Sequence, residues 1–334
     1  MRSLCVAVPA REAEGIRRAL HKQGLLRTGI SIVREGGTVF LPTASRVDTP
    51  YPVSEREFRE SFAPIRSYRD VANVPAEVKP DLPTSFDIVG DIAIIRISED
   101  LREHETAIAE AILRTNARVR VVAADGGVKG PLRIRDLRIL AGPDRTETVH
   151  REYGLAYRVD IAKAYFSPRL ASERNRVAQQ VQPGEVVLDV FSGVGPHAIL
   201  IARRRAPAVV HAFDANPDAF RYLEDNVRRN RADRVRPRLG DGIGLVAAVD
   251  RPNRIILDYP SDPDPAFRAA LFRLLPGGTV HYYAILNAAE REERERDLAD
   301  AAGSVGRSAE ILAVREVHGW SPAQKLFAFD VGVT

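Results

Sequence analysis

The C-terminal half of the chain alternates short apolar segments with longer amphipathic ones. Five apolar segments, each ending in a polar or glycine-containing turn, lie at residues 186–191, 209–214, 235–239, 254–257 and 279–284. Strands that alternate with helices predict a doubly wound sheet. Two further apolar segments, near residues 311–317 and 327–331, extend the predicted sheet to seven strands.

Two smaller α/β units are predicted ahead of this sheet. The elements of the first are a strand at residues 4–8, a helix at 10–23, and a hairpin of 29–33 and 38–42 about Gly36-Gly37. Residues 48–83 are rich in proline, serine and charge, which predicts a linker with one short helix near residues 55–62.

The second unit follows this linker. Its predicted elements are a strand at residues 86–97, a helix at 101–115, and strands at 119–123 and 132–141. The chain is therefore expected to form three domains, which span residues 1–56, 60–150 and 151–334. A length of 334 residues agrees with two or three domains.

Composition narrows the class of protein only slightly. The net charge is +4 with a pI of about 9.3. This charge permits a polyanionic partner, but an arginine-rich protein that binds no polyanion would show it equally well. A single cysteine, Cys5, excludes an internal disulfide and a multi-cysteine metal site. No apolar run is long enough to span a bilayer, and the first residues lack the apolar core of a secretory signal. We expect a cytoplasmic location and no metal.

Acidic residues end four successive predicted strands. Asp189 ends the first and is followed by a glycine turn at Gly193 and Gly195. Such a turn lets a ligand approach the backbone where a Cβ would collide. Asp214 ends the second strand, where a carboxylate can accept hydrogen bonds from a ribose diol.

The third and fourth strand ends continue this pattern. Asp241 follows the third strand and is suited to an adenine amino group, and Asp258-Tyr259-Pro260 follows the fourth. The third glycine of a dinucleotide-binding turn is missing, because His197 occupies that region. The pattern therefore predicts S-adenosylmethionine as the cofactor rather than a dinucleotide.

The segment at residues 159–170, VDIAKAYFSPRL, with Glu173-Arg174 and Arg176 behind it, resembles the signature of the archaeal and eukaryotic tRNA guanine-37 N1-methyltransferases. The resemblance covers essentially the whole chain, including residues 86–95, 130–135 and 277–283. It implies an α/β fold in which a class I, Rossmann-like methyltransferase domain with a seven-stranded sheet follows two smaller α/β (α+β) domains.

The resemblance also implies roles for individual residues. Glu173 would be the general base that removes the proton from guanine N1, and Arg133 would stabilise negative charge on O6. Tyr165 would line the site. The residues implied in cofactor binding are Arg169, Asp189, Phe191, Gly193, Gly195, Asp214, Asp241, Asp258 and Pro260.

One departure from the family pattern affects the predicted site. The family usually has Asn-Leu-Pro where this chain has Asp258-Tyr259-Pro260. An ionised aspartate only accepts hydrogen bonds, whereas asparagine also donates. Asp258 therefore has three interpretations: it accepts from the guanine N1 or N2 hydrogens, it shares the base role with Glu173, or it marks an altered substrate.

Three histidines, His197, His281 and His318, have no metal-ligand spacing and are interpreted as structural or incidental.

The partner implied by the resemblance is tRNA, bound by a monomer at the anticodon loop and, through the N-terminal domain, at the outer corner. A target base in that loop must be splayed out of its stack to enter a pocket. Candidate phosphate contacts are Arg17, Arg18, Lys22, Arg27, Arg203, Arg204, Arg205, Arg228, Arg229, Arg231, Arg234, Arg236 and Arg238, each of which has a solvated-surface interpretation too.

Three alternatives stay open from the sequence. The first is a relative that also methylates a tricyclic wyosine intermediate at the same position. The second transfers the aminocarboxypropyl group of the same cofactor, in a related family that lacks the SPRL segment. The third is a non-catalytic RNA-binding protein with a vestigial Rossmann domain, which the intact strand-end acids disfavour.

Overall fold

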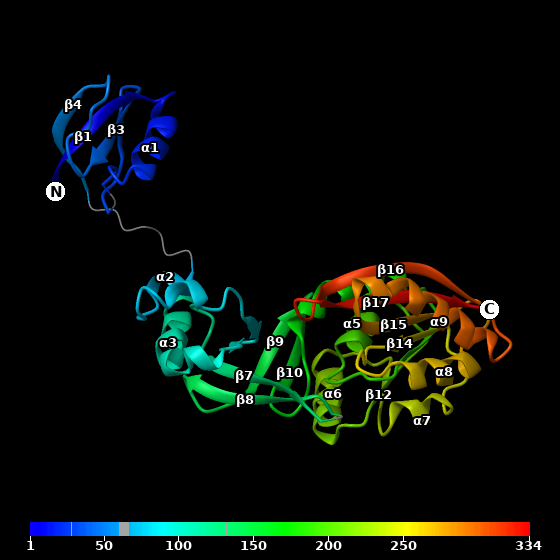
Figure 1. Cartoon of the computed structure of the whole chain (residues 1–334). Coiled ribbons are helices and arrows are strands. Elements are labelled where there is room, and N and C mark those ends of the chain that lie inside the picture. Colours follow the sequence, from blue (N-terminus) through cyan, green and yellow to red (C-terminus); the bar gives the residue numbers. More distant parts are fainter. Residues whose placement is uncertain (28, 60–66, 131) are drawn as a thin grey trace. The chain divides into compact units, whose positions relative to one another are not determined.

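A computed structural model describes residues 1–27, 29–59, 67–130 and 132–334. Contacts between residues divide the chain into two compact units, Met1–Asp70 and Val71–Thr334 (Figure 1). None of the helices in these described ranges is long and apolar enough to cross a membrane.

The N-terminal unit is a four-stranded sheet of order β2-β3-β1-β4 with one long helix. Its elements are β1 (Arg2–Pro9), α1 (Ala13–Lys22), β2 (Val33–Glu35), β3 (Thr38–Thr43) and β4 (Val53–Glu57), and the short helix α2 (Tyr68–Val71) follows at its end. Gly36 and Gly37 both have positive φ, as a two-residue hairpin turn requires. The predicted hairpin is confirmed, although its first strand begins at Val33.

The helix predicted near residues 55–62 is wrong where the structure describes it. Residues 53–57 form β4, which pairs antiparallel with β1, so that Cys5 lies opposite Ser54. Residues 60–62 lie outside the described ranges. The charged sequence SERE suits a sheet edge, where charged side chains discourage pairing with other chains.

The second unit begins with a four-stranded sheet of order β5-β6-β7-β8. Its elements are β5 (Asp87–Val89), β6 (Ile92–Ile95), α3 (Glu105–Thr115), β7 (Val121–Lys129) and β8 (Ile134–Ala141), with short 3-10 helices at Lys79–Asp81 and Glu99–His104. The single strand predicted at residues 86–97 is instead a hairpin, because Gly90 turns the chain with a φ of +60°.

A hairpin of β9 (Glu147–Glu152) and β10 (Leu155–Asp160) connects this sheet to the rest of the unit. The domain boundary predicted between residues 150 and 151 falls inside β9. One hydrophobic core contains Ile92 and Val121 from the first sheet together with Val177 and Ala198 from the following helices. Residues 71–334 therefore pack as one body.

The predicted seven-stranded sheet is confirmed, with order β13-β12-β11-β14-β15-β17-β16. Its strands are β11 (Val186–Asp189), β12 (Val209–Asp214), β13 (Val235–Leu239), β14 (Arg254–Leu257), β15 (Gly278–Asn287), β16 (Ala309–Gly319) and β17 (Gln324–Val333). All neighbours pair in parallel except β17, which is antiparallel to both β15 and β16. The fold class expected from the sequence is confirmed.

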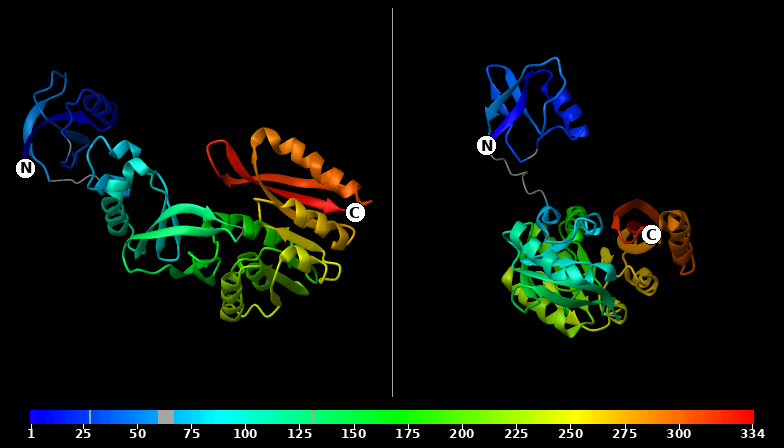
Figure 2. Two further views of the ribbon diagram at one scale, coloured as in Figure 1. Left: turned by 60° about the horizontal axis from the view of Figure 1, so that its bottom comes forward. Right: turned by 60° about the vertical axis from the view of Figure 1, so that its left-hand side comes forward.

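Helices cover both faces of this sheet (Figures 1 and 2). They are α4 (Ala171–Gln180), α5 (Pro196–Arg204), α6 (Pro217–Arg229), α7 (Gly242–Val246), α8 (Asp264–Arg273) and α9 (Arg291–Gly303), with 3-10 turns at Pro168–Leu170 and Ala288–Glu290. Buried residues of α4, α5 and α6 belong to one core, and those of α7, α8 and α9 belong to another. The carboxyl ends of β11, β12 and β14 therefore open at one edge between two helical layers.

Two glycines with nearly equal backbone angles allow a matched test of the packing around β7 and β8. Gly142 has a φ of 92° and Gly127 a φ of 97°. A Cβ on Gly142 would overlap the carbonyl oxygen of Arg120, whereas a Cβ on Gly127 meets nothing within 4 Å. Both alanine variants share the cost of the left-handed backbone, and Gly142→Ala adds overpacking, which costs about 1–3 kcal/mol more. Urea unfolding measures both, and equal losses would contradict this account.

Candidate active site

A cavity opens at the carboxyl ends of the central strands and gathers most of the predicted site residues. Those that line it are Arg133, Tyr165, Phe191, Gly193, Asp214, Asp241, Asp258 and Pro260. Four others do not line it: Arg169, Glu173, Asp189 and Gly195. The lining also includes residues that the sequence did not indicate as site residues, among them His197, Ser167, Arg174, His318 and Trp320.

Asp214 lies at the tip of β12 and is held by two backbone groups. Its Oδ2 accepts from the Gly193 N–H at 2.7 Å, and its Oδ1 accepts from the Asn216 N–H at 2.8 Å. Burial raises the pKa of Asp214, and these two hydrogen bonds act against that rise. The carboxylate is thus fixed in the cavity wall with acceptor capacity left for a ligand.

Asp241 and an aromatic pair form the neighbouring part of the wall. The Asp241 carboxylate caps α7 by accepting from the N–H groups of Ile243 and Gly244, at 3.2 and 3.3 Å. The rings of Phe191 and Tyr259 lie with their centroids 5.0 Å apart. An apolar ring face beside an acceptor carboxylate is suited to a flat heterocycle that carries an amino group.

The two glycines of the turn have different reasons for being glycine. Gly193 has a φ of 54° and lines the cavity. Gly195, with a φ of 90°, lies at the start of α5, and a Cβ there would come within 2.9 Å of the side chains of Leu223 and Ile199. The positive φ favours glycine at position 195, and a Cβ there would also force the ends of the Leu223 and Ile199 side chains to move.

Asp189 lies beneath the turn rather than in the cavity wall. It is 1% exposed, and neither carboxylate oxygen has a hydrogen-bond partner within the described part of the chain. Burial raises the pKa of Asp189 to about 7, against an opposing effect of His197. Its side chain therefore titrates near neutrality, and its direct contact with the cofactor stays a prediction.

Arg133 occupies the side of the cavity formed by the β7–β8 sheet. Its φ of 54° is unusual for a residue with a long side chain, and such strained backbones concentrate at functional sites. Its Nη1 donates to the Ser261 Oγ at 2.7 Å. The guanidinium carbon lies 4.7 Å from the Tyr165 ring centroid and 5.5 Å from that of Trp320. A planar cation is thus held between aromatic rings in the cavity wall.

No pattern in the sequence places Trp320 in this site. It lies in the turn between β16 and β17, far along the chain from β8, and lines the cavity there. The only available signal was that it is the single tryptophan of the chain.

Asp258 follows β14 and faces both the cavity and His197. Its Oδ2 lies 3.7 Å from the His197 Nε2. Burial acts to raise the pKa of Asp258, but His197, Arg133 and Arg174 together hold that pKa below its usual value. Asp258 is therefore an ionised carboxylate in the cavity wall at neutral pH.

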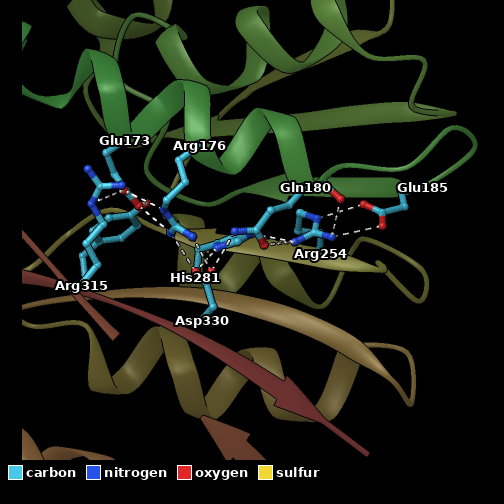
Figure 3. A network of polar contacts seen from close by, with 9 residues as sticks. Glu173, Arg176, Gln180, Glu185, Arg254, His281, Arg315 and Asp330 are labelled. Atoms are coloured by element: carbon cyan, nitrogen blue, oxygen red, sulfur yellow. Dashed lines mark hydrogen bonds and ion pairs between the residues drawn. The ribbon is translucent and has the colours of Figure 1, made fainter. Parts of the chain in front are cut away.

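Glu173 is fully buried on α4, and its carboxylate is hydrogen-bonded to other side chains. Its two oxygens accept from Nε and Nη2 of Arg176, at 2.9 and 2.7 Å, and Oε1 also accepts from the Tyr283 hydroxyl at 2.9 Å. Figure 3 shows Glu173 and Arg176 turned toward each other, with Asp330 below Arg176. The role of Glu173 as general base stays a prediction, and in this arrangement its carboxylate must leave Arg176 to reach the cavity.

The ion pair of Glu173 ends a longer buried network (Figure 3). Arg176 also pairs with Asp330, whose carboxylate lies 2.7 Å from the His281 Nδ1. Arg254 lies 2.9 Å from the His281 Nε2 and can only donate, so Nε2 accepts and Nδ1 donates to Asp330. His281 is thus neutral, and its role is structural.

Arg169 and Arg174 follow the same motif but have different environments. Arg169 is 47% exposed, and its Nε donates to Asp87 at 2.7 Å. Its predicted contact with the cofactor stays a prediction. Arg174 is 2% exposed and pairs with Glu152 through two hydrogen bonds, at 2.8 and 2.7 Å.

Family models match three consecutive parts of the chain. Residues 5–49 match the tRNA methyltransferase 5 N-terminal domain, and residues 71–146 match the TYW2 N-terminal domain. Residues 148–307 match the TRM5/TYW2 methyltransferase domain.

Curated relatives match over long ranges. The chain is 39% identical over 337 residues to the tRNA (guanine(37)-N(1))-methyltransferase Trm5b of Pyrococcus abyssi, a match that covers 99% of each chain. It is 36% identical over 222 residues to the tRNA 4-demethylwyosine(37)-methyltransferase Taw21 of Saccharolobus solfataricus, covering 65% of this chain and 83% of the relative.

Solved structures show the same relationship. The crystal structure of Trm5b from Pyrococcus abyssi superposes with a TM-score of 0.77 at 38% identity, covering 99% of both chains. A complex of aTrm5 with tRNALeu gives 0.71 at 29% identity, over 99% of this chain and 100% of that one. Methanocaldococcus jannaschii Trm5 in complex with adenosine gives 0.66 at 28% identity, over 98% of each. The chain therefore belongs to the Trm5 family of tRNA (guanine-37-N1)-methyltransferases.

Proposed function

We propose that this chain transfers a methyl group from S-adenosylmethionine to N1 of guanosine 37 in tRNA. One observation carries the proposal: the same cavity is lined by the strand-end acids Asp214 and Asp241 and by the Arg133 guanidinium, which lies between aromatic rings. Full-length relatives named for this reaction support it.

The residues at the strand ends fit the cofactor. The Asp214 carboxylate is positioned to accept from a ribose diol, and Asp241 to accept from an adenine amino group beside the Phe191 ring. Gly193 leaves the backbone accessible where the turn meets the cavity. Pro260 is part of the cavity wall. When bound, S-adenosylmethionine supplies a methyl group on a positively charged sulfur.

Arg133 is positioned for the target base. Guanine N1 carries a proton at neutral pH, and negative charge develops on O6 as that proton leaves. The Arg133 guanidinium stabilises this charge, with Ser261 and the Tyr165 ring fixing its orientation. Tyr165 and Trp320 also offer ring faces to a base that has left its stack.

Two carboxylates are candidates for accepting the N1 proton. Glu173 is implied by the family resemblance, but its oxygens are taken by Arg176 and Tyr283. Asp258 lines the cavity as an ionised carboxylate, and its Oδ2 lies 3.7 Å from the His197 Nε2. Both assignments are proposals, and they differ in which acid controls the pH dependence of the reaction.

The basic residues named from the sequence are proposed to bind tRNA, with the N-terminal unit at the outer corner of the tRNA. The protein is proposed to act as a monomer in the cytoplasm. Several of these cations already have intramolecular partners: Arg17 and Arg18 pair with Glu14, Arg229 lies near Asp225, and Arg204 and Arg205 donate to backbone carbonyls. Exposed ion pairs of this kind contribute little to stability and leave the cations available to phosphates.

A second candidate substrate is a tricyclic wyosine intermediate at the same tRNA position. Asp258 favours it, because this acid replaces the asparagine usual in the guanine enzymes and faces the cavity. The similarity to Taw21 of Saccharolobus solfataricus, named as a 4-demethylwyosine methyltransferase, points the same way. Methylation of either substrate would use the same cofactor site. Only the base ring that faces Arg133 and Asp258 would differ.

Mass spectrometry of nucleosides tests the proposed function directly. Unmodified tRNA carrying guanosine at position 37 is incubated with the protein and methyl-labelled cofactor, then digested. We expect the label in 1-methylguanosine alone, and tRNA with adenosine at position 37 serves as the control. An absence of 1-methylguanosine, or label only on tRNA that carries the tricyclic base, would refute methylation of guanine.

A further inference from the structure

Tyr283 is a buried tyrosine whose hydroxyl reaches the carboxylate of Glu173. It lies on β15 and is 0% exposed, and its O–H donates to the Glu173 Oε1 at 2.9 Å. Its ring centroid lies 6.4 Å from that of His197, which lines the cavity. One tyrosine therefore contacts Glu173 with its hydroxyl and lies beside the cavity wall with its ring.

The Tyr283 hydroxyl is a neutral hydrogen-bond donor. Burial, together with the negative charges of Glu173 and Asp258, holds the pKa of Tyr283 well above its usual value. The phenol therefore keeps its proton at neutral pH and can donate it to a carboxylate oxygen. Unlike the Arg176 guanidinium, it orients the Glu173 carboxylate without neutralising the negative charge that a proton acceptor needs.

The cation that pairs with Glu173 also pairs with a second acid (Figure 3). Both Nη1 and Nη2 of Arg176 donate to the Asp330 carboxylate, Nη2 at 2.9 Å. Asp330 is itself held on β17 by the His281 Nδ1 at 2.7 Å and by the Gln180 Nε2 at 2.9 Å. A buried guanidinium without an anionic partner is costly. Because Asp330 keeps Arg176 paired, Glu173 can leave Arg176 without that cost.

We propose that Tyr283 is a positioning residue for Glu173, whose carboxylate turns from Arg176 toward the cavity while the Tyr283 hydroxyl remains its hydrogen-bond donor. Asp330 retains Arg176 during this movement. The inference rests on the proposed function and takes Glu173, of the two candidate carboxylates, as the acceptor of the N1 proton. The carboxylate thus reaches the target base without becoming a buried charge that lacks a donor.

Loss of the Tyr283 hydroxyl should affect the two positions of Glu173 unequally. Beside Arg176, the carboxylate keeps two charged hydrogen bonds, at 2.9 and 2.7 Å. Turned toward the cavity, it depends on the Tyr283 hydroxyl, since the Arg315 Nε lies 4.0 Å from Oε2, beyond hydrogen-bond distance. Removal of the hydroxyl therefore destabilises the cavity-facing position more than the paired one, and methyl transfer slows.

Tyr282 provides a matched control on the same strand. Adjacent strand residues point to opposite faces of a sheet, so Tyr283 shares a core with residues of α4 and α5, whereas Tyr282 shares one with residues of α8. Tyr282 is also 0% exposed, and its hydroxyl also donates to a carboxylate, that of Asp264. Tyr282→Phe and Tyr283→Phe therefore remove the same group from equally buried positions, and both keep the ring that fills the core.

Single-turnover methyl transfer at saturating tRNA and S-adenosylmethionine tests the proposal. In Tyr283→Phe we expect a rate about tenfold lower, the factor for one hydrogen bond to a charged group, with unchanged affinity for both substrates. Tyr282→Phe should keep the wild-type rate. In Glu173→Gln, which lacks the ionised carboxylate, adding Tyr283→Phe should cause no further loss, whereas a merely structural role would lower the rate in both backgrounds.

Asp330→Asn tests the retention of Arg176 separately. Arg176 then depends on Glu173 for its negative charge, so departure of Glu173 becomes costly and we expect a rate at least about tenfold lower. Glu185→Gln is the matched control, because Glu185 pairs through two hydrogen bonds, at 2.9 and 3.2 Å, with the buried Arg254 at the other end of the network. It should lose stability and keep the wild-type rate.

The outcomes that would overturn the proposal are specific. One is a Tyr283→Phe variant with the wild-type rate, and another is an equal loss in Tyr282→Phe. A tenfold loss that persists in the Glu173→Gln background would give Tyr283 a structural role instead. Wild-type protein that forms no 1-methylguanosine would refute the proposed function itself, so the two kinds of failure are distinguishable.

Discussion

Arg133→Ala is expected to lower the single-turnover rate of methyl transfer by about 10²–10³-fold, the usual effect of removing one donor to a developing oxyanion. The guanidinium is held by Ser261 and two aromatic rings, so its interaction with O6 strengthens in the transition state without reorganisation of the site. Affinity for the cofactor, measured by calorimetry, should not change.

Two further variants separate charge from geometry at this position. Arg133→Lys keeps the positive charge but loses the planar fork, and we expect an intermediate rate. Ser261→Ala removes only the 2.7 Å hydrogen bond that orients the side chain, so its loss should be smaller, about tenfold. A rate for Arg133→Ala equal to that of the wild-type protein would exclude the role at O6.

Glu152→Gln is expected to reduce the free energy of unfolding by about 3–5 kcal/mol, the cost of leaving a buried charge without its partner. The Arg174 guanidinium is 2% exposed and the Glu152 side chain is 5% exposed, and two hydrogen bonds join them. Glutamine keeps one acceptor oxygen but not the charge, so Arg174 would remain ionised in a low-dielectric environment.

A double variant is the matched control for this ion pair. Glu152→Leu combined with Arg174→Met removes both charges, and it should lose much less stability than Glu152→Gln. Urea unfolding compares the two. A double variant that loses more stability than the single one would show that the side chains contribute through packing rather than through charge.

The sequence predicted the central sheet and the strand-end acids that line the cavity, because both depend on local patterns. Each strand is a short apolar run, and parallel strands place their carboxyl ends at one edge. Asp214 and Asp241 follow such runs directly. Their meeting in one cavity could therefore be predicted without knowing any contact between distant residues.

Features that depend on distant contacts could not be predicted in this way. β4 is a strand because it pairs with β1, although its charged sequence favours no strand by itself. Arg176 forms an ion pair with Asp330, which lies 154 residues further along the chain. The same guanidinium also binds the Glu173 carboxylate. His197 faces Asp258 only because β14 brings that acid to it.

Calorimetry of S-adenosylmethionine binding tests the account most directly, because all proposed steps depend on the cofactor lying against the strand-end acids. We expect the wild-type protein to bind it, and Asp214→Asn, which removes the charged acceptor at the β12 tip, to bind at least about tenfold more weakly. Asp218→Asn, on α6 outside the cavity lining, should bind like the wild-type protein. Equal binding by all three proteins, or no binding by the wild-type protein, would contradict the account.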